Sequence, residues 1–157
     1  MKPWKLLTLL LATCVVAACV TSPRRVSEPA ASIQQLSVAA DGSWSVDLRV
    51  QNYSSVPMRF ESIRLDLTVG GDAAGTLASS TPITIGPESA DVLTLAFAPS
   101  AQARLQTADA LAAGRSLPYR IDGTLRAAPD DRGAARDYTI RRDSALSPVP
   151  GLPGVLR

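Results

Sequence analysis

The chain has 157 residues, enough for one domain with an ordinary hydrophobic core. It contains no histidine, the commonest general base and metal ligand, which argues against enzymes that pair a serine or cysteine nucleophile with a histidine. Of its 16 basic residues only Lys2 and Lys5 are lysines, and the 14 arginines that remain are matched by 14 acidic residues. This balance argues against a protein that binds nucleic acid through its charge.

The first 18 residues have the pattern of a signal peptide. Lys2 and Lys5 precede an apolar run, residues 6–18, that is too short to span a bilayer comfortably. The run ends in Val16, Ala17, Ala18 and Cys19, which resembles the lipobox of bacterial lipoproteins. The resemblance implies cleavage before Cys19 and covalent attachment of lipid to its thiol. An uncleaved anchor and a soluble secreted protein are the alternatives.

Lipidation at Cys19 predicts a body held at a membrane, since two or more acyl chains anchor a protein stably. Val20, rather than an aspartate, follows the cysteine. By resemblance to the sorting rule of enteric-type bacteria, this implies the outer membrane, facing the periplasm. Cys14 lies within the segment that would be removed, so we expect no disulfide in the mature protein.

Two segments outside the expected domain at 32–143 lack regular patterning. Residues 19–31 have no apolar period and predict a lipidated, flexible tether. Residues 144–157 are rich in proline and glycine and predict an extended or disordered tail. Two basic pairs, Arg24-Arg25 and Arg141-Arg142, are interpreted either as contacts for anionic lipid or as solvated charge.

Between these segments, alternation of apolar and polar residues predicts half-buried strands. The clearest strand is 44–51, followed by a turn at Asn52 to Ser55. In the next strand, at 58–69, the apolar phase changes by one residue around Glu61-Ser62. A β-bulge there would keep both sets of apolar side chains facing the core.

The second half adds shorter strands and one helix. Gly70-Gly71 predicts a hairpin into a strand near 76–78, and further strands are expected at 83–85, 93–97, 117–126 and 138–140. A helix is expected over 101–113, with Ser100 as N-cap and Gly114 as its stop. Its apolar face is expected at Leu105, Ala108 and Leu111. The sequence therefore predicts an all-β protein, an immunoglobulin-like or fibronectin-like antiparallel β-sandwich of about seven strands with one short helix.

A family resemblance covers roughly residues 33–99. It rests on the run 46–53, the strand 57–69 with Gly70-Gly71, the turn Ile85-Gly86-Pro87 and the strand 92–97. These features resemble the late-embryogenesis-abundant type 2 family, also called WHy domains. The family's usual triplet is Asn-Pro-Asn, whereas this chain has Gln51-Asn52-Tyr53. The resemblance implies a non-enzymatic sandwich linked to desiccation or water stress.

Few residues carry functional chemistry. Asn52 and Tyr53 are the candidates for a loop contact, although a packing role is the alternative. We expect no catalytic residue, metal ligand or cofactor beyond the lipid on Cys19, because the pair Asp130-Asp131 is interpreted as a solvated turn.

The expected partners are the membrane, through the anchor, and a protein of unknown identity, with no nucleic acid. Two functions stay open: a protective or interaction module, and an accessory subunit of an envelope assembly.

Overall fold

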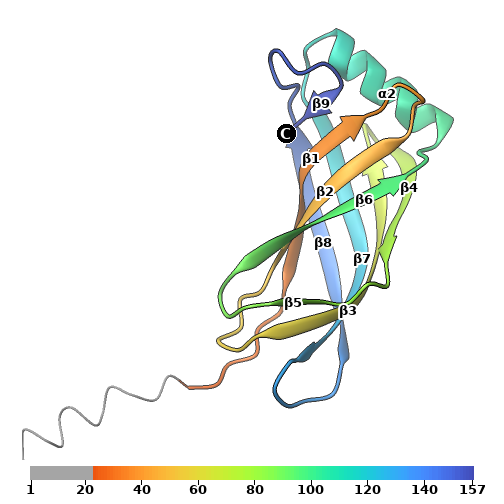
Figure 1. Cartoon of the computed structure of the whole chain (residues 1–157). Helices are drawn as coiled ribbons and strands as arrows, with labels where there is room; N and C mark the ends of the chain where they lie inside the picture. The colour runs from red at the N-terminus through yellow and green to blue at the C-terminus, as the bar shows by residue number, and fades with distance from the viewer. Residues whose placement is uncertain (1–22) are drawn as a thin grey trace, which may run out of the picture.

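The computed structural model describes residues 23–157, so the predicted signal peptide, the predicted lipobox and Cys19 lie outside the described residues. Nine antiparallel strands in this part of the chain form two sheets of a sandwich, with one helix across one end (Figure 1). The first sheet has the order β6-β2-β1-β9 and comprises β1 (Ala30–Val38), β2 (Trp44–Gln51), β6 (Ala90–Phe97) and β9 (Val155–Leu156).

The second sheet has the order β4-β3-β7-β8, with β5 also paired to β3. Its strands are β3 (Met58–Val69), β4 (Asp72–Ser79), β5 (Ile83–Ile85), β7 (Leu117–Pro129) and β8 (Arg136–Leu146). The helix α2 spans Ala101–Ala112. The predicted antiparallel sandwich with one short helix is therefore confirmed.

The core lies between the sheets, where one face of each strand is buried. In β2 the residues Trp44, Val46, Leu48 and Val50 are buried and alternate with more exposed polar residues. The Trp44 and Phe97 rings, opposite each other on β2 and β6, meet edge to face with centroids 5.8 Å apart. Burial of such apolar side chains is the main force that holds the two sheets together.

Strand β1 was not predicted, and a bulge explains why. Ala31 and Ile33 are buried in one phase and Leu36 in the other, because the pairing with β2 shifts between Ile33 and Gln35. A strand with such an interruption has no continuous alternation to recognise.

The predicted bulge in β3 is confirmed. Pairing with β7 shifts between Phe60 and Ser62, and this extra residue lets Met58 and Phe60 as well as Ile63 and Leu65 point into the core. The glycine hairpin is also confirmed, since Gly70 and Gly71 have φ of 58° and 93° and join β3 to β4.

The helix α2 has the predicted N-cap, and the Ser100 side chain accepts a hydrogen bond from the Ala103 N–H. Its buried face differs from the predicted one. Ala103, Thr107 and Ala110 are buried, whereas Leu105 is 64% exposed. The small side chains allow the helix to lie close to β4 and β3, and leucine at 105 is left in solvent.

The C-terminal segment corrects the expectation of an extended or disordered tail at 144–157. Strand β8 continues to Leu146, and the chain then turns back so that β9 pairs with Leu36 and Ser37 of β1. Leu156 is fully buried. Prolines and glycines here form the turns of a short returning loop, and a buried leucine fixes the loop to the core.

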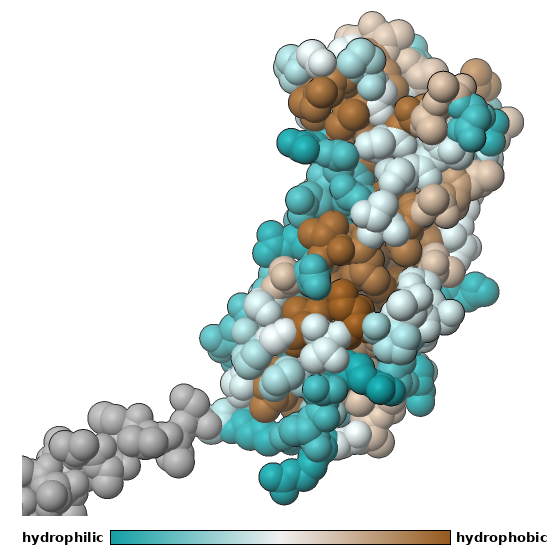
Figure 2. Space-filling model, viewed as in Figure 1, coloured by the Kyte–Doolittle hydropathy of each residue, from teal (hydrophilic) through white to brown (hydrophobic). Residues whose placement is uncertain are grey.

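The two ends of the sandwich differ (Figure 1). The segment 23–29 and the loops around 52–57 and 130–135 lie at one end, called here the basal end, and α2 with β9 lies at the other, the distal end. Figure 2 shows mainly hydrophilic residues over the basal end in this view, with hydrophobic residues gathered higher up on the same face.

Candidate functional site

The segment 23–29, which was expected to be part of a flexible tether, is bound to the basal end. The backbone N–H groups of Arg25 and Ser27 donate to the hydroxyl oxygens of Ser55 (2.8 Å) and Ser54 (3.0 Å). The Ser55 N–H donates in turn to the Arg25 carbonyl at 2.9 Å. These bonds satisfy the backbone as a strand partner would, so the segment is ordered without being a strand.

The basic pair Arg24-Arg25 is engaged within the protein. Arg24 bonds to the Asp131 carboxylate and Arg25 to that of Glu88, both at 3.0 Å. The hydrogen bond from Arg24 lowers the pKa of Asp131 below the usual carboxyl value, and the bond from the Arg132 backbone adds to the effect. The pair therefore links the segment to two loops.

Asn52 organises the basal loops from inside. It is 1% exposed, and its side-chain nitrogen donates to three carbonyl oxygens, those of Val56, Ile85 and Gly86, at 2.9, 3.2 and 2.8 Å. Its side-chain oxygen accepts from the Ser54 N–H at 2.8 Å. An asparagine carries donors and an acceptor on one short side chain, which explains its place in the turn. Its side chain does not reach the surface.

Tyr53, by contrast, is 51% exposed. Its backbone carbonyl accepts a hydrogen bond from Arg25 at 3.1 Å, so the turn that carries the ring is tied to the N-terminal segment. Of the two loop residues singled out in the sequence, only Tyr53 has a side chain exposed at the surface. Its role as a contact stays a prediction.

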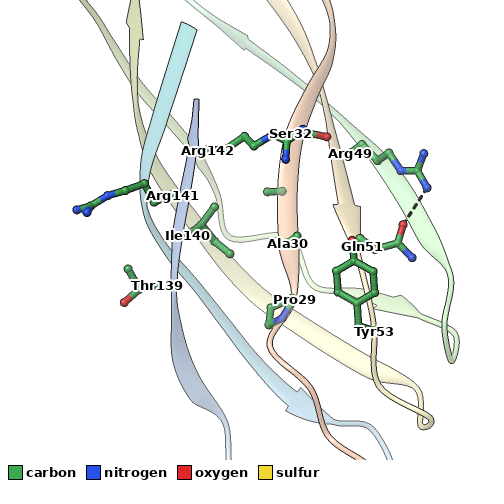
Figure 3. A pocket seen from close by; sticks show the side chains of 11 residues that line it. Pro29, Ala30, Ser32, Arg49, Gln51, Tyr53, Thr139, Ile140, Arg141 and Arg142 are labelled. Atoms are coloured by element: carbon green, nitrogen blue, oxygen red, sulfur yellow. Dashed lines mark hydrogen bonds between the residues drawn. The ribbon is translucent and has the colours of Figure 1, made fainter. Parts of the chain in front are cut away.

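A groove of about 380 Å³ runs beside Tyr53, between the lower parts of β1 and β8 (Figure 3). It arises because β8 is the last strand of its sheet and β9 covers only Leu36 and Ser37 of β1, which leaves the edge of β1 near residues 30–34 without a strand partner. Its lining residues come from the two strands, from β2, and from the positions just before β1 and just after β2. They are Pro29, Ala30, Ala31, Ser32, Arg49, Gln51, Tyr53, Thr139, Ile140, Arg141 and Arg142.

One backbone group on this edge is bonded across the sandwich. The Ile33 N–H donates to the buried Tyr119 hydroxyl at 3.2 Å, so it points away from β2. Because alternate residues of an antiparallel strand face the same edge, the N–H and C=O of Ala31 also point away from β2, into the groove.

The two neighbouring arginines of β8 point in different directions. Figure 3 shows Arg142 directed toward Ser32 of β1 and Arg141 directed away from the groove. Arg141 bonds to Asp122 at 2.7 Å, and this bond raises the pKa of the guanidinium. Arg142 forms no ion pair among the described residues, although it shares the inward phase of Ile140 and Leu146. An arginine at a position of the strand where the alternation predicts a core-facing residue is the sequence signal that could have revealed the groove.

The acidic residues at and beside the β7–β8 turn do not line this groove. Asp131 bonds to Arg24, and Asp137 lies 3.3 Å from Arg126 on the opposite side of the hairpin turn. Within residues 23–157 no three acidic or cysteine side chains converge as metal ligands. No helix in this part of the chain is both long and apolar enough to cross a membrane. The groove combines arginines, hydroxyl groups, an exposed tyrosine and the backbone of a strand edge, which can form ion pairs and hydrogen bonds with a ligand.

A family model described as late embryogenesis abundant protein matches residues 47–140, more than half of the chain. The chain belongs to this family. The match extends beyond the resemblance seen at 33–99 and takes in α2, β7 and most of the β7–β8 hairpin. Membership of the late embryogenesis abundant family suggests a role related to water stress. No curated protein sequence matches the chain.

Solved structures of other proteins are similar to this one at low sequence identity. A protein from Archaeoglobus fulgidus has 15% identity and a TM-score of 0.42, covering 79% of this chain and 98% of its own. A protein from Arabidopsis thaliana has 15% identity and a TM-score of 0.47, with 81% and 82% covered. A putative late embryogenesis abundant protein has 16% identity and a TM-score of 0.41, with 88% and 75% covered.

Proposed function

We propose that this late embryogenesis abundant protein is a bacterial lipoprotein, anchored through Cys19 to the outer membrane and facing the periplasm. Its body is a non-catalytic β-sandwich that contacts and protects other macromolecules of the envelope during desiccation or water stress. The family supports the link to water stress. The sequence Val16 to Cys19 supports the anchor.

The observation that carries an interaction role is the arrangement of the basal end. The segment 23–29 leads into the fold at the same end as the exposed Tyr53 and the basic groove. A lipid on Cys19 would be only a few residues from this end. The anchor would then hold the groove close to the membrane surface, where envelope proteins are concentrated.

A second function is favoured by the free edges of β1 and β8. An exposed strand edge is a common docking site for an extended segment of another protein. The protein would then be an accessory subunit of a secretion, pilus or transport assembly rather than a dispersed protective module. The two functions differ in whether one partner is bound in fixed proportion.

The test combines lipid labelling with crosslinking in intact cells. We expect the wild-type protein to incorporate labelled palmitate and Cys19→Ala to remain an unlipidated precursor of higher apparent mass. Mature, membrane-held Cys19→Ala protein would contradict the lipoprotein proposal.

Crosslinking followed by mass spectrometry then separates the two functions. Many weak contacts, together with poorer survival of drying in a deletion strain, are expected for a protective module. One stoichiometric partner, with unchanged survival of drying, would instead identify an assembly subunit. A Cys19→Ala strain is the matched control, because the groove is intact while the anchor is absent.

A further inference from the structure

We propose that the groove between β1 and β8 binds an extended acidic segment of a protein partner, with its carboxylates held by Arg142 and Arg49. This inference rests on the proposed interaction function and names the chemistry of the partner. It is carried by the charge of the groove, by the direction of Arg142 and by the edge of β1 that has no strand partner.

The charge of the groove is of one sign. Three arginines line it and no aspartate or glutamate does. Of the four arginines in the two basic pairs of the sequence, Arg24, Arg25 and Arg141 bond to carboxylates of the protein itself. Among residues 23–157, Arg142 forms no such bond, and neither does Arg49, whose guanidinium donates to the Gln51 side chain at 2.8 Å. Of the three arginines that line the groove, Arg142 and Arg49 are therefore the two whose charge is available to an external anion.

The geometry places these two arginines on either side of one strand. Ser32 of β1 pairs with Arg49 of β2, whose side chain is directed away from β1 toward Gln51, whereas Arg142 is directed toward Ser32 from the β8 side (Figure 3). Guanidinium groups bind carboxylates through two parallel hydrogen bonds, and a serine hydroxyl adds a further donor. A carboxylate on a segment lying along β1 can therefore bind Arg142, and a second carboxylate can bind Arg49 once that side chain leaves Gln51.

The backbone of β1 favours an extended chain as the occupant. The N–H and C=O of Ala31 share the phase of the Ile33 N–H and so face the groove, where the ladder of an added strand would bond to them. A lipid head group would use the arginines alone. An inward-pointing charge on an edge strand, such as Arg142, can also serve to prevent aggregation through that edge. This alternative does not explain why Arg49, on β2, also lacks a carboxylate partner among the described residues.

The test uses the full-length mature lipoprotein in neutral detergent and a fluorescent ten-residue peptide of alternating threonine and glutamate, followed by anisotropy. We expect binding that weakens about tenfold in Arg142→Gln and in Arg49→Gln, since each loses a charge-assisted contact. The matched control, Arg141→Gln, lies next to Arg142 and points away, so its affinity should change less than about twofold. Equal thermal unfolding of all variants shows that the fold is retained.

Several results would overturn the inference. The glutamine version of the peptide could bind equally well, or Arg141→Gln could weaken binding as much as Arg142→Gln, which would indicate non-specific attraction. Binding of soluble short-chain phosphatidylglycerol in place of the peptide, with the same dependence on Arg142, would indicate a lipid site. If the peptide does not bind but the protein still crosslinks to partners in cells, only the acidic segment is rejected. If the peptide binds but the protein is neither lipidated nor crosslinked in cells, the proposed function is rejected instead.

Discussion

The basal and distal ends of the sandwich are closed by different means. At the basal end a few polar side chains, above all Asn52 and the serines of the 54–55 turn, bond to loop backbone. At the distal end α2 covers the sheets with small side chains, and a proline- and glycine-rich loop returns the chain to β1. The comparison teaches that loop order at the basal end depends on single side chains, whereas closure of the distal end is shared among many weak contacts.

The largest effect should come from removing the central side chain of the basal end. Asn52→Ala removes the hydrogen-bond partner of three carbonyl oxygens, one buried and two partly buried, and of the buried Ser54 N–H, so we expect a loss of about 3 kcal/mol in the free energy of unfolding. Urea denaturation measures it. Gln51→Ala, at the neighbouring and less buried position, is the control. Equal small losses in both variants would contradict the central role of Asn52.

A smaller effect is expected at the distal end. Ser100→Ala removes the N-cap bond to Ala103 and the bond that the hydroxyl donates to the Ala73 carbonyl at 2.7 Å. We expect a loss of about 1 kcal/mol, the usual cost of a helix cap, in the same denaturation experiment. Leu105→Ala, at the exposed position on the same helix, should change stability by less than about 0.5 kcal/mol. If Leu105→Ala cost more than Ser100→Ala, the observed helix orientation would be wrong.

The smallest effect concerns the attachment of segment 23–29. The pKa of Asp131 is lowered by Arg24, so the pair stabilises the attached segment at pH values above the usual aspartate pKa and loses this contribution as the pH falls through the lowered value. We expect Asp131→Asn at neutral pH, and the wild-type protein in strong acid, to exchange the Arg25 and Ser27 amide hydrogens faster. Exchange unchanged in both cases would show that the serine bonds alone hold the segment.

Much of the fold was predictable from the sequence because its strands alternate. The bulge at Glu61 was predictable as well, since a change of apolar phase between Phe60 and Ile63 has one simple structural solution. Strand β1 and the return of β9 were missed for the opposite reason. A bulge breaks the alternation of β1, and two residues of β9 gain their partners only through contacts more than 100 positions away in sequence.

The candidate site was predictable only in part. A turn at Asn52-Tyr53 follows from residue types, but the choice between a buried Asn52 and an exposed Tyr53 depends on the loops packed around them. The groove needs the relative position of β1 and β8, which belong to different sheets. The predicted buried face of α2 was wrong because the sequence pattern favoured the large apolar Leu105, whereas close packing of the helix against β4 requires small side chains such as alanine.

The central claim is that the basal end is the interaction surface. The most direct measurement introduces a photoreactive amino acid at Tyr53 in one strain and at Leu105, the more exposed distal position, in another. After illumination of intact cells, the account predicts covalent protein adducts from position 53 and few from position 105. Adducts from position 105 alone would contradict it and move the interaction surface to the distal end.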